Sequence, residues 1–272
     1  FLHLFGKACR KITKVITGMS FNKFSKEKLK GTRDSVAIIL AAGRGTRLQP
    51  LTNSTPKCLI EVGSQPIIYH QISSLARFGI CNIVLVVGFI ADRVRGYVNA
   101  AFPALDINFV ENTLEKTNTL YSLALAAETL EPETSVFQLN GDVVFDPRII
   151  ELLQFAENDT SYLATKMGRC AEEEIKIRLA ADGSVIELSK KIAQEEAIGE
   201  AIGINKFSPN FFLELKKSLY ILKDDYLMEY FEYAIEHAIK NGAKIYPLDI
   251  KELKAVEVDF LDDASVDAIN KH

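Results

Sequence analysis

From Ser35 onward, short runs rich in β-branched residues alternate with longer segments whose apolar residues recur with a helical period. The runs VAIIL (36–40) and NIVLVVG (82–88) are almost continuously apolar, which is typical of strands buried on both faces of a parallel sheet. A helical segment that begins at Pro66 separates them, and this order of strand, helix and strand is a βαβ unit. The alternation predicts an α/β fold.

The expected elements fall into two groups along the chain. Up to Asp142, helices are expected at 66–78, 91–99 and 119–130, and further strands at 107–110 and 135–142. After about residue 160 the strands alternate apolar and polar residues, and Asp182-Gly183 is a typical hairpin turn. Helices are expected there at 209–218, 225–240 and 263–270, and strands at 244–247 and 255–259. We therefore expect a Rossmann-like, mostly parallel sheet flanked by helices, with a mixed or antiparallel extension in the C-terminal half.

The N-terminal residues differ in charge from the rest of the chain. Residues 1–33 contain nine Lys or Arg residues and one acidic residue, Glu27, whereas the whole chain of 272 residues has a formal net charge of -4. We expect a basic tail over 1–34 that is either flexible or an amphipathic helix in contact with an anionic membrane surface. A single domain over 35–272 is expected to follow it, and no nucleic acid partner is expected.

The cysteines and the apolar runs bear on the location of the protein. The four cysteines have neither CxxC nor Cys/His ligand spacing, so a zinc site is not indicated. The apolar runs, such as Ile83 to Val87, are too short to span a bilayer, and no transmembrane helix is expected. A cytoplasmic location is the simplest expectation.

The segment LAAGRGTRLQPLTNSTPK (40–57) follows the first expected strand and combines glycines with cationic residues. Gly43 and Gly45 allow the backbone to approach a ligand closely and to turn its N–H groups toward an anion. A GxG pair after a strand also fits a simple tight turn. Leu48 occupies the position where a P-loop requires its second glycine and where a dinucleotide fingerprint requires a small residue. ATPase and dehydrogenase functions are therefore disfavoured.

The whole segment resembles the N-terminal signature of nucleotidyltransferases that make sugar nucleotides and cytidylyl-activated alcohol phosphates. The signature is L-x-A-G-x-G-T-R-L, then P-L-T and then P-K, and the long gap between Arg47 and Lys57 is similar to that of the sugar and choline-type enzymes. The resemblance implies that Arg47 contacts the phosphates of a nucleoside triphosphate (NTP) and that Lys57 contacts phosphate at the reaction centre, which makes them the expected catalytic residues. The NTP-binding residues that it implies in this loop are Leu40, Ala41, Ala42, Gly43, Arg44, Gly45, Thr46, Arg47 and Lys57.

Two aspartates are candidates for binding a metal ion. Nucleotidyl transfer brings two phosphate anions together, and a divalent cation with cationic side chains offsets their repulsion. Asp142 ends the apolar strand in LNGD and Asp259 lies in VEVDFLDD, and both resemble the metal-binding aspartates of the family. A single aspartate at a strand end is also often a turn or helix cap. Together with the loop, the resemblance implies Mg²⁺ held by Asp142 and Asp259.

The segment KTNTLYSL (116–123) resembles the nucleobase-binding segment of cytidylyltransferases that act on phosphocholine, aminoethylphosphonate and related small phosphates. Sugar-specific enzymes usually have a different segment here. The resemblance favours CTP as the nucleotide, with Asn112, Thr117, Asn118 and Ser122 as further candidate NTP contacts. Capping of a helix by Asn118 and simple packing of Ser122 are the structural alternatives.

The candidate acceptor-binding residues lie in the C-terminal half. The segment DGSVIELSKK resembles a family hairpin that places Lys190 against the acceptor phosphate, and Lys176 and Arg178 alternate on the strand before it. Glu200 matches the segment that lines the acceptor pocket, and Tyr230 is a candidate for cation–π contact with a quaternary ammonium group. The alternatives are solvated strand positions, a strand edge and core packing of the aromatic residues. The chain has no tryptophan, which relatives often carry before the second aspartate, so phosphocholine is one candidate acceptor among several.

These features together predict a Mg²⁺-dependent nucleotidyltransferase that transfers CMP from CTP to a small phosphorylated acceptor and releases pyrophosphate. The acceptor is expected to be an alcohol phosphate, a phosphocholine-like compound or a phosphonate, and these small-molecule substrates are the expected partners. A sugar-1-phosphate nucleotidyltransferase that uses UTP, dTTP or GTP is the alternative within the class. A non-catalytic nucleotide-sensing module of the same fold is the alternative outside it. The sequence leaves the oligomeric state open, with a homodimer as one candidate.

Overall fold

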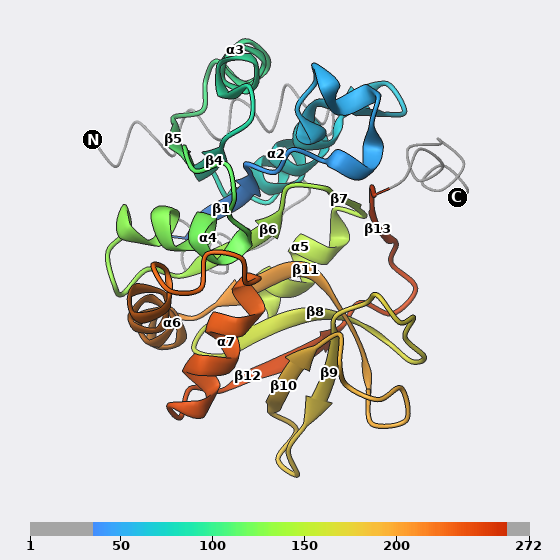
Figure 1. Cartoon of the computed structure of the whole chain (residues 1–272). Helices are drawn as coiled ribbons and strands as arrows, with labels where there is room; N and C mark the ends of the chain where they lie inside the picture. Colours follow the sequence, from blue (N-terminus) through green and yellow to red (C-terminus); the bar gives the residue numbers. More distant parts are fainter. Residues whose placement is uncertain (1–34, 260–272) are drawn as a thin grey trace, which may run out of the picture.

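The computed structural model describes residues 35–259. The basic tail and the helix expected at 263–270 lie outside the described residues. Figure 1 shows a central sheet with helices on both sides of it. No helix in the described part of the chain is long and apolar enough to cross a membrane.

A mixed sheet of nine strands forms the centre of the described domain. Its main path has the order β10-β9-β11-β6-β1-β4-β5, and β8 pairs with both β11 and β12. Strand β1 is parallel to β4 and β6, and β4 is parallel to β5, whereas β11 is antiparallel to β6, β8 and β9. The expected fold, with a parallel first half and a mixed extension, is confirmed. The strands are β1 (Val36–Ala41), β4 (Asn82–Val87), β5 (Ile107–Glu111), β6 (Val136–Asn140), β8 (Ser161–Met167), β9 (Lys176–Leu179), β10 (Val185–Ser189), β11 (Gly199–Phe207) and β12 (Ile245–Asp249).

Strand β1 shows how both faces of the sheet are covered. Its successive side chains point to opposite faces, so that Ile39 packs in one apolar cluster while Ile38 and Leu40 pack in another. The Ile39 cluster includes residues of α2, α3 and α5, and the other cluster includes residues of α4, α6 and α7. The helices are α2 (Ile67–Arg77), α3 (Ala91–Ala101), α4 (Thr119–Glu128), α5 (Arg148–Phe155), α6 (Pro209–Leu222) and α7 (Phe231–Lys240).

Two pairs of short strands lie outside the central sheet. Strand β2 pairs with β3, and β7 pairs with β13, each antiparallel. The second pair joins the segment after β6 to the last described strand, which lies far away in the sequence. The four strands are β2 (Glu61–Val62), β3 (Gln65–Pro66), β7 (Val143–Phe145) and β13 (Ala255–Glu257).

Helix α7 differs from its prediction, because the helix expected at 225–240 begins only at Phe231. The preceding segment hydrogen-bonds to the start of α4 instead. The Asn118 N–H donates to the Leu227 carbonyl at 2.8 Å, and the Leu120 N–H donates to the Glu229 carbonyl at 3.2 Å. These contacts use carbonyl groups that a longer helix would have used internally, so the prediction was wrong at its N-terminal end.

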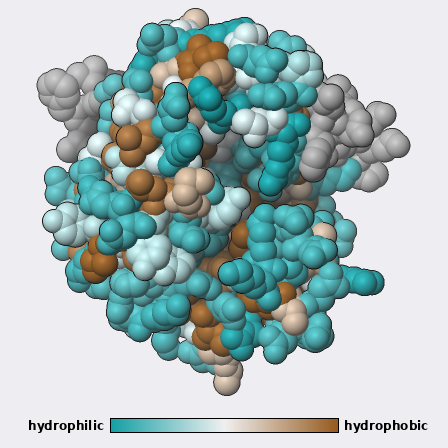
Figure 2. Space-filling model, in the orientation of Figure 1, coloured by the Kyte–Doolittle hydropathy of each residue, from teal (hydrophilic) through white to brown (hydrophobic). Residues whose placement is uncertain are grey.

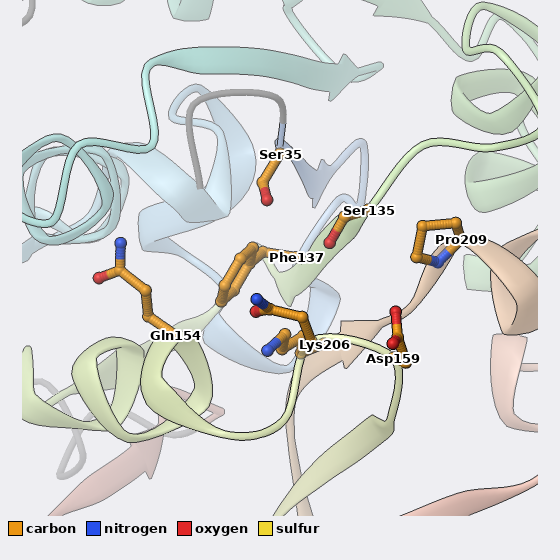
Figure 3. A pocket seen from close by; sticks show the side chains of 8 residues that line it. Ser35, Ser135, Phe137, Gln154, Asp159, Lys206 and Pro209 are labelled. Atoms are coloured by element: carbon orange, nitrogen blue, oxygen red, sulfur yellow. The ribbon is translucent and has the colours of Figure 1, made fainter. Parts of the chain in front are cut away.

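A small cavity of about 120 Å³ lies at the amino end of β1, beside Ser35 and Lys206 (Figure 3). Lys206 Nζ donates to the carbonyl oxygens of Ala156 (3.0 Å) and Glu157 (3.3 Å), just after the end of α5. Burial lowers the pKa of Lys206 to about 8. The glycine-rich loop leaves β1 at its other end, so this cavity is separate from the candidate site.

Candidate active site

The loop after β1 turns at Gly45. This residue has a φ of 62°, in the left-handed region where glycine avoids the steric cost of a Cβ. Its carbonyl oxygen accepts a hydrogen bond from Thr52 Oγ1 at 2.7 Å, and a Cβ on Gly45 would lie 2.9 Å from Lys57 Cβ. The turn therefore packs closely against Lys57. The rest of the loop forms three short 3-10 helices, η1 (Thr46–Leu48), η2 (Leu51–Asn53) and η3 (Lys57–Leu59).

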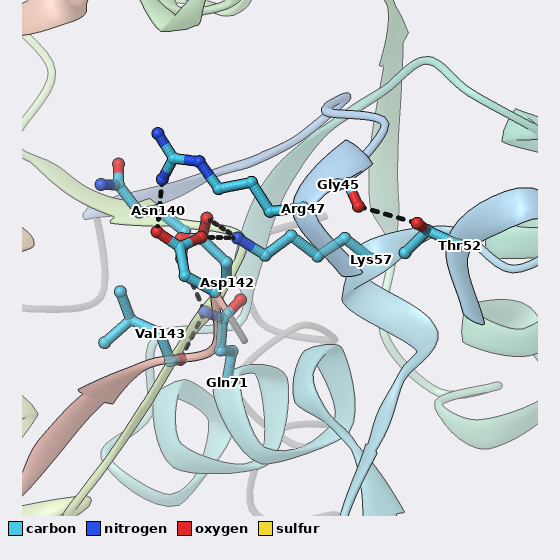
Figure 4. A network of polar contacts seen from close by, with 9 residues as sticks. Gly45, Arg47, Thr52, Lys57, Gln71, Asn140, Asp142 and Val143 are labelled. Atoms are coloured by element: carbon cyan, nitrogen blue, oxygen red, sulfur yellow. Dashed lines mark hydrogen bonds and ion pairs between the residues drawn. The ribbon is translucent and has the colours of Figure 1, made fainter. Parts of the chain in front are cut away.

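Lys57 joins the two predicted aspartates (Figure 4). Its Nζ lies 2.7 Å from Asp142 Oδ2 and 2.6 Å from Asp259 Oδ1, and Arg47 Nη1 lies 2.9 Å from Asp259 Oδ2. The Lys57 side chain is 13% exposed, and burial alone would lower its pKa. The two carboxylates together outweigh burial, so the pKa of Lys57 is raised above its usual value. Burial would raise the pKa of Asp259, but Lys57 and Arg47 lower it. The structure thus brings together all four residues predicted for catalysis and metal binding.

Asp142 lies in the turn between β6 and β7. Gln71, a fully buried residue of α2, donates from Nε2 to the carbonyl oxygens of Asn140 (2.7 Å) and Val143 (2.8 Å) on either side of this turn (Figure 4). A buried amide with two acceptors of this kind holds the turn in one position. The sequence analysis missed Gln71, because a single polar residue on an amphipathic helix carries no distinguishing signal.

Strand β13 adds a third carboxylate, that of Glu257. The Val258 N–H donates to the Asp142 carbonyl at 2.9 Å, and one carboxylate oxygen from each of Asp142, Glu257 and Asp259 lies within 4.8 Å of the others. Burial, with the two nearby aspartates, raises the pKa of Glu257 to about 7. The sequence analysis missed Glu257, although the strand expected at 255–259 would place Glu257 and Asp259, two residues apart, on one face.

The acidic cluster formed by Asp142, Glu257 and Asp259 fits a hard divalent cation. Carboxylate oxygens are the ligands that such cations prefer. Asp142 Oδ1 is buried and has no hydrogen-bond partner among the described residues, so one oxygen remains free to coordinate a metal ion. Such a cation would also offset the repulsion among three carboxylates at this distance.

The residues of the glycine-rich loop progress from buried to exposed. Leu40 and Ala41 are buried at the end of β1, and Ala42 is half-buried. Gly43, Arg44, Thr46 and Arg47 are exposed, and the Arg44 guanidinium lies 4.9 Å from the centre of the Phe89 ring. Figure 2 shows that the face of the molecule in this view is mostly hydrophilic and is hollowed near its middle.

The predicted nucleobase segment forms a second polar group of residues. Asn112 Nδ2 lies 2.8 Å from Thr117 Oγ1 and 3.1 Å from Ser122 Oγ, so these three residues are brought together at the start of α4. Asn118 is the N-cap of α4, where its Oδ1 accepts from the Thr119 N–H at 2.9 Å. The alternative that Asn118 caps a helix is therefore observed.

Two predicted acceptor lysines, Lys176 on β9 and Lys190 just after β10, have different surroundings. Lys190 Nζ lies 5.7 Å from the centre of the Tyr230 ring and 3.4 Å from Glu173 Oε2. Lys176 is only 2% exposed, and its Nζ donates to the carbonyl oxygens of Glu172 (2.9 Å) and Lys190 (2.8 Å). Lys176 thus supports the backbone beside Lys190.

Two further acceptor candidates pair with carboxylates. Arg178 Nε donates to Glu187 Oε2 at 2.9 Å across the β9-β10 hairpin. Burial and the neighbouring Glu174 raise the pKa of Glu200, on β11, to about 7. Among the predicted acceptor residues, the Lys190 and Tyr230 side chains lie close enough for a cation–π contact.

The comparison with protein families gives a match over residues 36–176, to the model described as nucleotidyl transferase. The chain belongs to the nucleotidyl transferase family. The match covers the glycine-rich loop, Lys57 and Asp142, and it confirms the resemblance inferred from the loop signature.

Two similar proteins span most of this chain. A CMP-5'-(3-aminopropyl)phosphonate synthase of Streptomyces rubellomurinus is 29% identical over 242 residues, which cover 82% of this chain and 36% of the relative. The chain therefore spans about a third of that relative's length. A CTP:phosphoglutamine cytidylyltransferase of Campylobacter jejuni is 29% identical over 256 residues, which cover 85% of this chain and 98% of the relative.

Solved structures share the fold. The CTP:phosphocholine cytidylyltransferase of Streptococcus pneumoniae is 24% identical, with a TM-score of 0.69 and coverage of 84% of this chain and 96% of that one. An inositol-1-phosphate CTP transferase of T. maritima is 20% identical, with a TM-score of 0.70 and coverage of 84% and 90%. The α/β nucleotidyltransferase fold thus extends over nearly all of the described domain.

Proposed function

We propose that this nucleotidyl transferase family member transfers CMP from CTP to a small phosphorylated acceptor and releases pyrophosphate. The observation that carries the proposal is the placement of Lys57, with Arg47 beside it, between Asp142 and Asp259 at the end of the glycine-rich loop. The choice of CTP is supported by the segment KTNTLYSL and by the two relatives whose names specify CMP or CTP.

In the proposed reaction, an oxygen of the acceptor phosphate or phosphonate attacks the α-phosphorus of CTP. A new bond forms between these atoms, and the bond from the α-phosphorus to the bridging oxygen breaks, so that its electron pair leaves with pyrophosphate. The second pKa of a phosphate ester is about 6, so the attacking oxygen is largely deprotonated at neutral pH and needs no strong general base. Lys57 and Arg47 supply positive charge beside the reacting phosphates.

Asp142, Asp259 and Glu257 would hold Mg²⁺ in this proposal. When bound, the ion supplies charge neutralisation between the two reacting phosphates. Lys57 keeps Asp142 and Asp259 close together, and the β7-β13 pair holds Glu257 at the same place. The chain therefore prepares the ligand set before substrates bind.

A sugar-1-phosphate acceptor with another nucleotide is the second candidate. It is favoured by mannose-1-phosphate guanylyltransferases, of which the one from Drosophila pseudoobscura is 37% identical over 131 residues, or 47% of this chain. A screen of CTP, UTP, GTP and dTTP against alcohol phosphates, phosphonates and sugar-1-phosphates, with pyrophosphate release as the readout, separates the two. Turnover of sugar-1-phosphates without use of CTP would overturn the CTP proposal, and nucleotide binding without any turnover would support a sensor.

A further inference from the structure

Glu232, in the first turn of α7, is a buried carboxylate with one oxygen that lacks a hydrogen-bond partner among the described residues. The residue is 8% exposed, and its Oε2 has no hydrogen-bond partner among the described residues. A buried carboxylate without a compensating group is costly, because it loses its hydration and gains nothing in return. An acidic residue at a helix start is common, but it normally remains in contact with water. The burial of Glu232 therefore calls for a specific explanation.

The first two turns of α7 are fixed between the two predicted substrate sides of the site. On the nucleotide side, the Phe231 N–H donates to Thr119 Oγ1 at 3.0 Å, at the start of α4. On the acceptor side, Glu236 Oε1 accepts from the Leu188 N–H at 2.9 Å, just before Lys190. These two contacts hold Glu232 beside both the nucleobase segment and the β9-β10 hairpin.

The charges near Glu232 have both signs, because Glu257 raises its pKa and Lys190 lowers it. Burial, with Glu257, outweighs the lowering effect of the Glu232 backbone N–H and of Lys190, and raises the pKa of Glu232 to about 7. Lys190 Nζ itself lies over the Tyr230 ring and beside Glu173. Glu232 and Glu257 place two carboxyl groups in this part of the site, and the Tyr230 ring offers a face that attracts cations.

We infer that the Glu232 carboxylate binds an ammonium group of the acceptor, so that the acceptor is a zwitterion with a phosphate or phosphonate at one end and an amine at the other. This inference rests on the proposed function and narrows its acceptor class. Lys190 contacts the anionic end, and Glu232 with Tyr230 contacts the cationic end. An alcohol phosphate without an ammonium group leaves the Glu232 carboxylate unpaired. An acceptor with a second anionic group is repelled by Glu232 and Glu257.

The test uses acceptors that differ only in the cation. Ethanolamine phosphate carries a primary ammonium, choline phosphate carries a quaternary one, and ethyl phosphate carries none. With saturating CTP, kcat/KM is measured from pyrophosphate release for each acceptor. In parallel, equilibrium binding of ethanolamine phosphate and ethyl phosphate is measured by calorimetry. The relative activity of ethanolamine phosphate and choline phosphate decides which kind of ammonium the site takes.

The variants are Glu232→Gln, Glu232→Asp and, as a matched control, Glu229→Gln. E229Q removes the same charge as E232Q, at a position three residues earlier where the side chain is exposed. A hydrogen bond to a charged group contributes about 1.5–3 kcal/mol, so E232Q is expected to lower kcat/KM and affinity for the ammonium acceptors roughly 10- to 100-fold. For ethyl phosphate, the kcat/KM of E232Q is expected to equal or exceed that of wild type. E232D is expected to restore part of the preference, and E229Q to leave it unchanged.

Two results would overturn the inference: a wild-type protein that uses ethyl phosphate as well as the ammonium acceptors, or an E232Q variant that loses activity on all three equally. Either can occur while CTP is consumed, in which case the proposed function stands and the acceptor assignment fails. If no acceptor yields pyrophosphate but ethanolamine phosphate binds in a Glu232-dependent way, the reaction fails and the ligand assignment stands. If neither pyrophosphate release nor Glu232-dependent binding is seen, both the proposed function and the acceptor assignment fail.

Discussion

Replacement of Lys57 by Met tests whether this cation holds the site together. Met keeps most of the apolar stem but removes the ammonium, and it leaves three carboxylates within 4.8 Å of one another, those of Asp142, Glu257 and Asp259. The variant therefore loses two ion pairs, of 2.7 Å and 2.6 Å, and gains uncompensated repulsion. We expect the folded state to be destabilised even where no substrate is present.

The size of this loss follows from burial. Removal of one partner of a buried ion pair costs about 3–5 kcal/mol, because the remaining charge is left unpaired. The Asp142 and Asp259 side chains are 23% and 24% exposed, so water screens part of the repulsion and we expect about 2–3 kcal/mol. For a domain of this size, each kcal/mol lowers Tm by about 2–4 °C, which predicts a fall of about 4–12 °C.

The assay is thermal unfolding at pH 8 in EDTA, followed by circular dichroism. Lys217→Met is the matched control, because Lys217 Nζ also lies 2.7 Å from a carboxylate oxygen, that of Glu214, but its side chain is 58% exposed. The control is expected to lose less than about 1 kcal/mol. Added Mg²⁺ is expected to restore stability to K57M, because it binds the folded ligand set in preference to the unfolded chain. Equal Tm values for K57M and the control would refute the reasoning.

Three further predictions concern the loop, the metal ligands and the buried glutamate. Gly45→Ala places a Cβ 2.9 Å from Lys57 Cβ at a φ of +62°, whereas Gly63→Ala has a similar φ of +71° but open space around the Cβ. In denaturant unfolding, G45A is therefore expected to lower the free energy of unfolding more than G63A. Equal losses would contradict the close packing. Asp142→Asn and EDTA are each expected to lower pyrophosphate release at least about 100-fold with circular dichroism unchanged, and full activity in EDTA would exclude the metal. The pKa of Glu232 is raised to about 7 in the folded state, so Glu232 stabilises the folded state at low pH, and this stability is lost as the pH rises from the ordinary pKa of 4.5 through 7. Between pH 5 and pH 8 the free energy of unfolding of wild type is therefore expected to fall on the order of 2–3 kcal/mol more than that of E232Q. Parallel curves of unfolding free energy against pH would contradict the raised pKa.

The parallel half of the fold was predictable because its strands are buried on both faces. Continuous apolar runs report that burial directly, and the strand expected at 36–40 is found as β1, Val36–Ala41, while the run at 82–88 is found as β4, Asn82–Val87. The loop signature likewise predicted residues that the structure brings together. Arg47 and Lys57 lie in the loop after β1, and Asp142 follows the neighbouring parallel strand β6, so all three lie beyond the carboxyl ends of these strands. Asp259 follows β13, and the pairing of β13 with β7 brings it to the same place.

The start of α7 was not predictable from periodicity. The segment from Asp225 to Tyr230 has aromatic residues at helical spacing, yet its carbonyl groups accept hydrogen bonds from the start of α4. Those donors lie about 110 residues earlier in the chain. A contact of this range leaves no local signal, so the sequence pattern extended the helix too far.

Charged residues show why partners matter more than residue type in this site. Lys176 and Lys190 look equivalent in the sequence, but folding directs the Lys176 ammonium to two backbone carbonyls and leaves Lys190 over an aromatic ring. Glu232 looks like an ordinary acidic residue of a first helical turn, where the helix dipole favours it. Glu232 differs from such a residue because α4 and β10 pack against α7 and bury its side chain. A carboxylate in that position gains most from a cationic ligand. Under the acceptor assignment that we infer, the packing of α7, rather than a motif, therefore sets the acceptor preference.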